Sequence, residues 1–151
     1  MNVKFETIPE YRIAYVRQTG PYGPANRQAM EKLKQWAGEK KLLTESAILF
    51  GIPQDNPDTT PPANCRYDAC IVLSPDFPIG DGMCECTLPG GKYAIIQIRH
   101  TAEDVQRAWA DLFPALRGGG YQMDNKPILE RYIGELLDHD LCELCVPVKA
   151  L

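Results

Sequence analysis

The chain has 151 residues with 16 basic and 20 acidic side chains, and its net charge of −4 argues against non-specific binding to a nucleic-acid backbone. This length is near the usual domain size and predicts a single domain over residues 1–151. No apolar run approaches the roughly 20 residues that cross a bilayer, and the N-terminus lacks the layout of a secretory signal, so we expect a cytoplasmic protein with no membrane partner.

The first half of the chain alternates between β-prone segments, breakers and one amphipathic segment. The breaker cluster Gly20–Pro24 precedes a segment whose apolar residues recur at helical spacing. A polar loop over residues 54–64 is too short to be a domain linker. The predicted elements are a strand over residues 3–17 with a break at 8–10, a helix over 25–40, and strands over 47–52 and 67–73.

The pattern starts again at Met83, which indicates an internal repeat. Thr7-Ile8-Pro9 reappears as Thr87-Leu88-Pro89, and in the same register Phe50 aligns with Glu130. The predicted elements of this half are a helix that begins after an N-cap at Thr101 and ends at Gly118–Gly120, and strands over 126–133 and 141–148.

The two halves together predict an α+β fold. It is a tandem pseudo-two-fold repeat of strand-helix-strand-strand modules with an antiparallel sheet, with repeat one over about residues 1–75 and repeat two over about 83–151. Two half-sheets that each leave one face uncovered would bury these faces against one another. The crevice between them is then a central ligand cleft.

Glu130 is an unusual residue for its strand. In an extended segment Ile128, Glu130 and Tyr132 share one face, and a carboxylate held inside a protein is costly without compensating partners. One interpretation puts Glu130 at a frayed strand end, paired with Arg131 or Lys126. The other puts it in an aromatic-lined crevice, where a cationic guest supplies the missing charge and the rings add cation–π contacts.

Six cysteines leave a metal site or disulfides to be considered. In a strand, residues three apart point to opposite faces, so Cys142 and Cys145 could not bind one metal ion without a turn between them. We therefore favour reduced cysteines packed as small apolar side chains in strands, and we predict no metal and no cofactor. The six residues are Cys65, Cys70, Cys84, Cys86, Cys142 and Cys145.

Several separated motifs, in order and over essentially the whole chain, resemble the GyrI-like small-molecule-binding family. The motifs are Phe50-Gly51-Ile52-Pro53-Gln54-Asp55-Asn56-Pro57, Thr60-Pro61-Pro62, Cys65-Arg66-Tyr67-Asp68-Ala69-Cys70, Ala108-Trp109, Gly120-Tyr121 and Lys126-Pro127-x-x-Glu130-x-Tyr132.

This resemblance implies a tandem fold with a central ligand cleft and a functional glutamate deep in it, at Glu130. In the family the domain is the effector-binding part of AraC-type and MerR-type regulators that respond to lipophilic cations. It also occurs alone, in gyrase-inhibitory proteins and in hydrolases of cyclopropane-bearing DNA alkylators. Because Met1 directly precedes the first predicted strand, we expect no helix-turn-helix and no direct nucleic-acid partner.

The preferred hypothesis is a stand-alone protein that binds lipophilic, cationic aromatic compounds, as expected of a multidrug-type binding protein, with Glu130 as the buried counter-ion. The candidate ligand-binding residues are Glu130, Tyr132, Trp109, Tyr15, Tyr93, Phe50, Tyr67, Phe113 and Tyr22. A hydrolase with Glu130 as general base and Tyr132 assisting is the alternative, and a protein partner such as DNA gyrase is a third hypothesis. His100 and His139 are isolated, and we interpret them as solvated residues.

Overall fold

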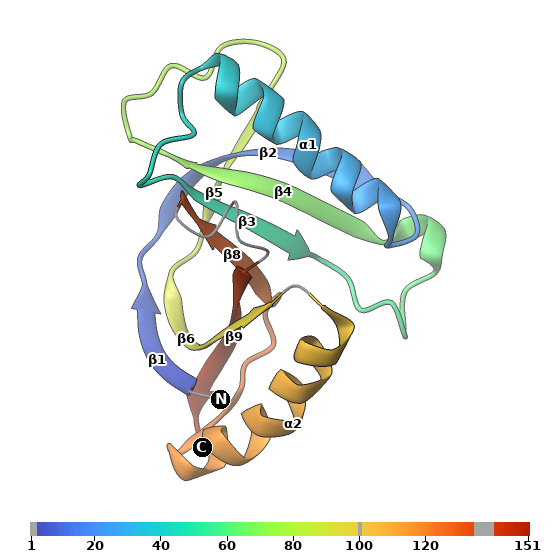
Figure 1. The fold of residues 1–151 in the computed structure, drawn as a ribbon, viewed down its shortest axis with the longest axis vertical. Helices are drawn as coiled ribbons and strands as arrows, with labels where there is room; N and C mark the ends of the chain where they lie inside the picture. Colours follow the sequence, from blue (N-terminus) through green and yellow to red (C-terminus); the bar gives the residue numbers. More distant parts are fainter. Residues whose placement is uncertain (1–2, 100, 135–140) are drawn as a thin grey trace.

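The computed structural model describes residues 3–99, 101–134 and 141–151 (Figure 1). His100 and His139 lie outside the described residues. The helices and strands predicted from the sequence are present, together with a short strand, β7, and a 3-10 helix, η1, that were not predicted. The elements are β1 (Val3–Ile8), β2 (Tyr11–Thr19), α1 (Pro24–Glu39), β3 (Ile48–Pro53), the 3-10 helix η1 (Pro62–Asn64), β4 (Arg66–Leu73), β5 (Cys84–Leu88), β6 (Gly91–Arg99), α2 (Ala102–Gly118), β7 (Tyr121–Met123), β8 (Leu129–Ile133) and β9 (Leu141–Ala150).

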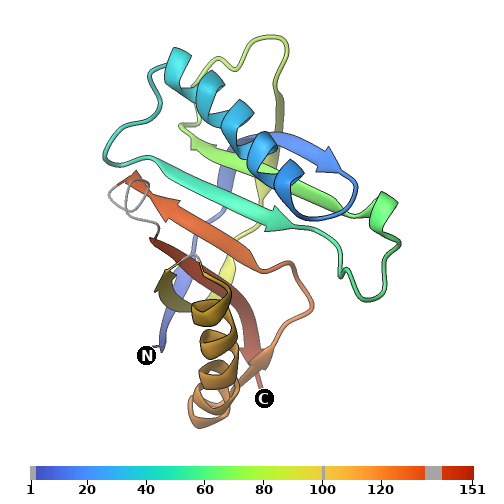
Figure 2. The ribbon, with the colours of Figure 1, turned by 45° about the vertical axis from the view of Figure 1, so that its right-hand side comes forward.

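The strands form one antiparallel sheet, which confirms the predicted α+β class. Its strand order is β1-β6-β9-β8-β3-β4-β2-β5, and β7 pairs with β9. The two halves of the chain are therefore joined edge to edge through β3 and β8. Both helices lie on the same side of this sheet, α1 over β2 and β4 and α2 over β6 (Figure 2). The tandem repeat itself remains a prediction from the sequence.

The first strand of each predicted module pairs with the other half of the chain. β1 pairs with β6, and β5 pairs with β2, so the modules are not self-contained. The connection between β1 and β2 and the connection between β5 and β6 are in contact at Gly90. A Cβ atom at Gly90 would lie 2.6 Å from the Ile8 carbonyl oxygen and 2.8 Å from the Glu10 nitrogen, so this position needs a glycine.

Three apolar clusters stabilise the sheet and its helices. One packs α1 through Ala29, Leu33 and Ala37, and another packs α2 through buried residues such as Leu112. The third cluster, which includes Phe50, lies on the face of the sheet away from the helices and draws residues from both halves. The two halves are therefore both hydrogen-bonded side by side and packed together on this second face.

The ends of α2 follow the sequence, and the helix contains a proline. The Thr101 side chain accepts a hydrogen bond from the Asp104 backbone nitrogen at 3.2 Å, as expected of an N-cap. Pro114 lies inside the helix, which continues to Gly118. Its position on the exposed side of α2 lets the chain keep the helix despite the missing N–H donor.

The cysteines are all free thiols, but they do not share one environment. Cys142 and Cys145 are buried in different clusters, on opposite faces of β9, as the alternation predicts. Cys65 and Cys70 are also buried. The expectation of packed side chains is wrong for Cys84 and Cys86, which are exposed because β5 is an edge strand.

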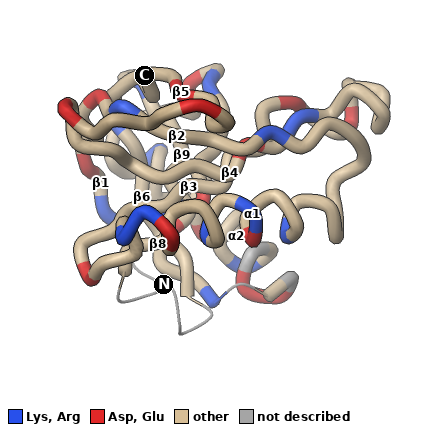
Figure 3. The backbone as a smooth tube through the Cα atoms, turned by 90° about the horizontal axis from the view of Figure 1, so that it is seen from above, with Lys and Arg blue, Asp and Glu red and all other residues tan. Residues whose placement is uncertain are grey.

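Charged residues of both signs are interspersed over the backbone rather than gathered in one run (Figure 3). Among the described helices, none combines the length and the apolar composition that crossing a membrane requires. The charged residues that matter for the site are therefore individual ion pairs between strands, and not an extended patch of one charge.

Candidate functional site

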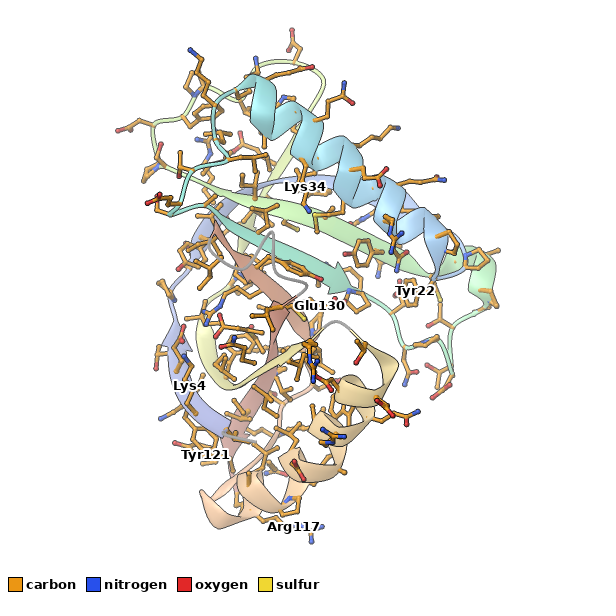
Figure 4. The ribbon with its side chains drawn as sticks, viewed as in Figure 1. Lys4, Tyr22, Lys34, Arg117, Tyr121 and Glu130 are labelled. Atoms are coloured by element: carbon orange, nitrogen blue, oxygen red, sulfur yellow. The ribbon has the colours of Figure 1, made fainter. Side chains whose placement is uncertain are left out.

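Glu130 lies in the middle of the sheet. Its strand β8 is flanked by β3 on one side and by β9 on the other, and the residues beside Glu130 are Gly51 and Leu144. Because Glu130 and the preceding Leu129 are paired with neighbouring strands, this end of β8 is not frayed, and the structure does not support the frayed-end interpretation. In Figure 4 Glu130 lies between the two helices, near the centre of the molecule.

Arg131 belongs to the opposite face of β8. Its guanidinium donates to Glu143 at 3.0 Å and to the two carboxylate oxygens of Glu6 at 2.7 and 3.1 Å. Lys126 lies 3.8 Å from Asp124. The two cations that the sequence offered as partners for Glu130 are thus in ion pairs with other carboxylates.

Two tyrosines and a cysteine surround Glu130 on the helix side of the sheet. The Tyr132 hydroxyl donates a hydrogen bond to Glu130 Oε2 at 3.0 Å. Burial, followed by the negative charge of Glu130, raises the pKa of the Tyr67 and Tyr132 hydroxyls above their ordinary value. The same two causes raise the pKa of the Cys142 thiol to about 12. At neutral pH these three neighbours are therefore uncharged.

Gly51 provides the space that brings Tyr67 to Glu130. The Tyr67 hydroxyl lies directly over the Gly51 Cα, where a Cβ atom would overlap it. Tyr67 is only 6% exposed, so its ring has little room to move. A glycine inside a strand often marks such a close approach of another group to the backbone. Gly51, the cross-strand neighbour of Glu130, is therefore part of the site although it has no side chain.

We expect Gly51→Ala to destabilise the protein by about 1–3 kcal/mol, because the added methyl group overpacks the buried Tyr67 ring. Urea denaturation measures this loss. The matched control is Gly51→Ala combined with Tyr67→Phe, which removes the clashing oxygen and should recover much of the lost stability. Additive losses in the double variant would contradict this explanation.

The remaining aromatic candidates are distributed over three regions. Trp109 packs on the α2 cluster that Tyr132 also contacts, and Phe113 lies beside it with ring centroids 6.1 Å apart, but Phe113 is 50% exposed. The Tyr22 hydroxyl instead donates to the Arg66 carbonyl oxygen at 2.8 Å.

Three candidates lie on the face of the sheet away from the helices. They are Phe50, Tyr93 and Tyr15, all in or against the cluster on that face. Phe50 is fully buried, and its cross-strand neighbour on β8 is Arg131 rather than Glu130. Phe50 and Glu130, which the sequence repeat aligns, therefore lie on opposite faces of the sheet. The structure brings together Glu130, Tyr132 and Tyr67, and Trp109 of α2 packs against a cluster that Tyr132 also contacts.

Sequence reasoning did not identify Gly51 and Cys142 as site residues. A signal existed for Gly51, because a glycine within an apolar β-prone run is unusual. None existed for Cys142, whose place beside Glu130 depends on strand pairing. Among the described residues, no three His, Cys, Asp or Glu side chains are arranged to bind a metal ion. The group can act as a hydrogen-bond acceptor and negative centre in aromatic surroundings.

Comparisons with known proteins agree with these observations. A family model described as the GyrI-like small molecule binding domain matches residues 1–149. The chain is 41% identical, over 99% of its length and 100% of the relative's, to the SPbeta prophage-derived putative transcriptional regulator YosT of Bacillus subtilis (strain 168). It is 31% identical, over 99% of both chains, to a DNA gyrase inhibitor of Edwardsiella piscicida.

One solved structure with a similar fold carries a ligand in its name. It is the structure of SAV2435 bound to tetraphenylphosphonium, which matches with a TM-score of 0.57 over 99% of this chain and 94% of that one. The sequences are 14% identical, so the match is one of fold.

Proposed function

The chain belongs to the GyrI-like small-molecule-binding domain family, and we propose that it binds lipophilic, cationic aromatic compounds between its two helices, with Glu130 as the counter-ion. Tyr132, Tyr67 and Trp109 are the proposed wall residues. The proposal places binding, rather than catalysis, as the role of this site.

The observation that carries the proposal is the placement of the Glu130 carboxylate on the helix side of a central strand, next to tyrosine rings. A carboxylate attracts a cation more strongly there than in open water, because the surroundings are less polarisable. Aromatic faces add about 0.5–1 kcal/mol each by cation–π contact, and more when the cation is desolvated. The neighbouring hydroxyls and thiol remain neutral, so Glu130 is the anionic member of this group of four side chains.

The tetraphenylphosphonium complex of SAV2435 supports the choice of ligand class. The test is a thermal-shift comparison of this cation with tetraphenylborate, which has nearly the same shape and the opposite charge, and with neutral triphenylphosphine oxide. We expect a concentration-dependent stabilisation by the cation that exceeds that of both controls. Equal stabilisation by the anion would contradict a counter-ion at the site.

A second candidate function is binding to DNA gyrase, and the 31% identity to a named gyrase inhibitor favours it. We expect a gyrase-active protein to lower the rate of DNA supercoiling in an assay with purified gyrase, in proportion to its concentration. Glu130→Gln is the informative control, because a surface contact with gyrase should survive this change. Unchanged supercoiling at saturating protein would exclude direct inhibition.

The hydrogen-bonded pair of Glu130 and Tyr132 also carries the hydrolase alternative. In that reaction Glu130 would accept a proton from water while Tyr132 donates a hydrogen bond to the electrophile. The binding hypothesis and the hydrolase hypothesis predict different fates for the compound. Incubation with a cyclopropane-bearing alkylator should return the compound unchanged if the site only binds, and a hydrolysed product would show catalysis.

A further inference from the structure

The outer flank of α1 forms a groove with the edge of the sheet, on a different part of the surface from Glu130. The groove has a volume of about 390 Å³. One wall is a stripe of helix residues from Ala25 to Gln35, and the other is the end of β2. The lining residues are Val16, Arg17, Gln18, Ala25, Gln28, Ala29, Glu31, Lys32 and Gln35.

The β2 side of this groove is an open strand edge. β2 runs from Tyr11 to Thr19 and pairs with β4 over nearly all of its length. On the other side β5 covers only Tyr11–Tyr15. In the part of the chain that the structure describes, Val16–Thr19 therefore has no strand on its outer side. Alternate residues of such an edge point their N–H and C=O groups outward, ready to pair with another strand.

The dimensions of the groove match an extended peptide. The helix stripe from Ala25 to Gln35 is about 15 Å long at the rise of an α-helix. A strand of about five residues spans about the same length. Gln18 also has a buried amide oxygen without a hydrogen-bond partner among the described residues, and an incoming N–H group can satisfy it once the amide turns toward the groove.

The charge near the groove selects an acidic occupant. Residues 24–41, which contain α1, have five basic and two acidic side chains, whereas the whole chain has a net charge of −4. Of the charged lining residues, Arg17 forms a bidentate hydrogen bond with Asp68, and Glu31 and Lys32 are both exposed. The helix wall over residues 25–35 is nevertheless positive, because it carries Arg27, Lys32 and Lys34 against the single carboxylate of Glu31. A second copy docked through the same flank would bring two positively charged helices together, which is unfavourable.

From this edge, this groove and this charge, we propose that an acidic peptide segment of a partner protein binds here as an added strand on β2, between β2 and α1. Backbone pairing with Val16–Thr19 provides the affinity, and Lys32 provides the preference for acidic side chains. This site is independent of small-molecule binding at Glu130.

The test uses a fluorescein-labelled, C-terminally amidated pentapeptide that alternates valine and glutamate, titrated against the full chain. We expect saturable binding that Lys32→Glu weakens about fivefold or more. The matched control is Arg27→Glu, an exposed residue of α1 outside the lining set, which should change the affinity less than about twofold. Gln28→Trp should abolish binding by filling the groove, while Glu130→Gln should leave it unchanged.

Backbone pairing is tested with the same peptide carrying N-methyl groups at alternate residues, which we expect to bind about tenfold or more weakly. Equal binding of the methylated peptide overturns the added strand, and so does equal loss in Lys32→Glu and Arg27→Glu. Absence of saturable binding up to about 1 mM overturns the site itself. Sedimentation that shows a dimer lost in Lys32→Glu assigns the groove to a second copy instead.

Discussion

Glu130→Gln should weaken the binding of tetraphenylphosphonium about 10- to 100-fold and leave the binding of neutral triphenylphosphine oxide nearly unchanged. At an effective dielectric constant of about 20, a charge pair about 5 Å apart is worth about 3 kcal/mol, and desolvation of the two ions removes part of it. We therefore expect a net loss of about 1.4–2.7 kcal/mol of binding free energy, which corresponds to binding that is about 10- to 100-fold weaker. Glutamine preserves the shape of the side chain, so the aromatic contacts stay in place.

The measurement is a fluorescence or calorimetric titration of wild type and variant with each compound. Tetraphenylborate should bind the variant as well as or better than the wild type, because its repulsion by Glu130 is removed. Glu103→Gln is the matched control: it removes the same charge from an exposed position in the first turn of α2 and should alter no affinity by more than about twofold. Equal losses for the cation and the neutral compound in Glu130→Gln would remove the counter-ion role.

Much of this site could be predicted from the sequence because it depends on local alternation. The shared face of Glu130 and Tyr132 follows from their spacing of two residues in a strand, and the hydrogen bond between them confirms it. The helices were predictable for the same reason, since their apolar residues repeat at 3.6-residue spacing. These features need no information about which strands are neighbours.

The rest depends on pairing between distant segments, which the sequence does not determine locally. The sequence repeat aligns Phe50 with Glu130, but Phe50 lies on the face of the sheet away from the helices and Glu130 lies on the helix side. Because successive residues of a strand point to opposite faces, an alignment of two strands that is wrong by one residue assigns every side chain to the opposite face. The exchange of β1 and β5 between the two halves was missed because it is a property of topology.

Arg131→Met should destabilise the protein by about 3–5 kcal/mol, a large part of the total stability of a domain of this size. Arg131 is 6% exposed and lies between Glu143, which is 5% exposed, and the half-buried Glu6. Methionine fills a similar volume but has no charge. The cost arises because the buried Glu143 carboxylate then keeps only Lys4, whose nitrogen lies 3.7 Å away and whose side chain is 66% exposed, and such a weakly compensated buried charge is strongly unfavourable.

The matched control is Arg66→Met, which removes an arginine that also binds a carboxylate through two nitrogens. Arg66 donates to Asp55 at 2.9 Å in both bonds, but its side chain is 44% exposed. Solvent screens such a pair, so the expected cost is much smaller than that of Arg131→Met. Urea denaturation at neutral pH gives both values. A similar cost for the two variants would mean that burial does not decide the energy of the Arg131 pair.

The pH dependence separates lost charge pairing from lost packing. The hydrogen bond from Arg131 holds the pKa of Glu6 below its ordinary value of 4.5. A lowered pKa in the folded state gives stability above that ordinary value, and this stability is lost as the pH falls through the folded-state pKa. In Arg131→Met, Glu6 loses the hydrogen bond that lowers its pKa and keeps only the weaker effect of Lys4, so acid should destabilise the variant less than the wild type. The difference in unfolding free energy should therefore shrink as the pH falls from about 7 to about 3, whereas a packing defect would leave it constant.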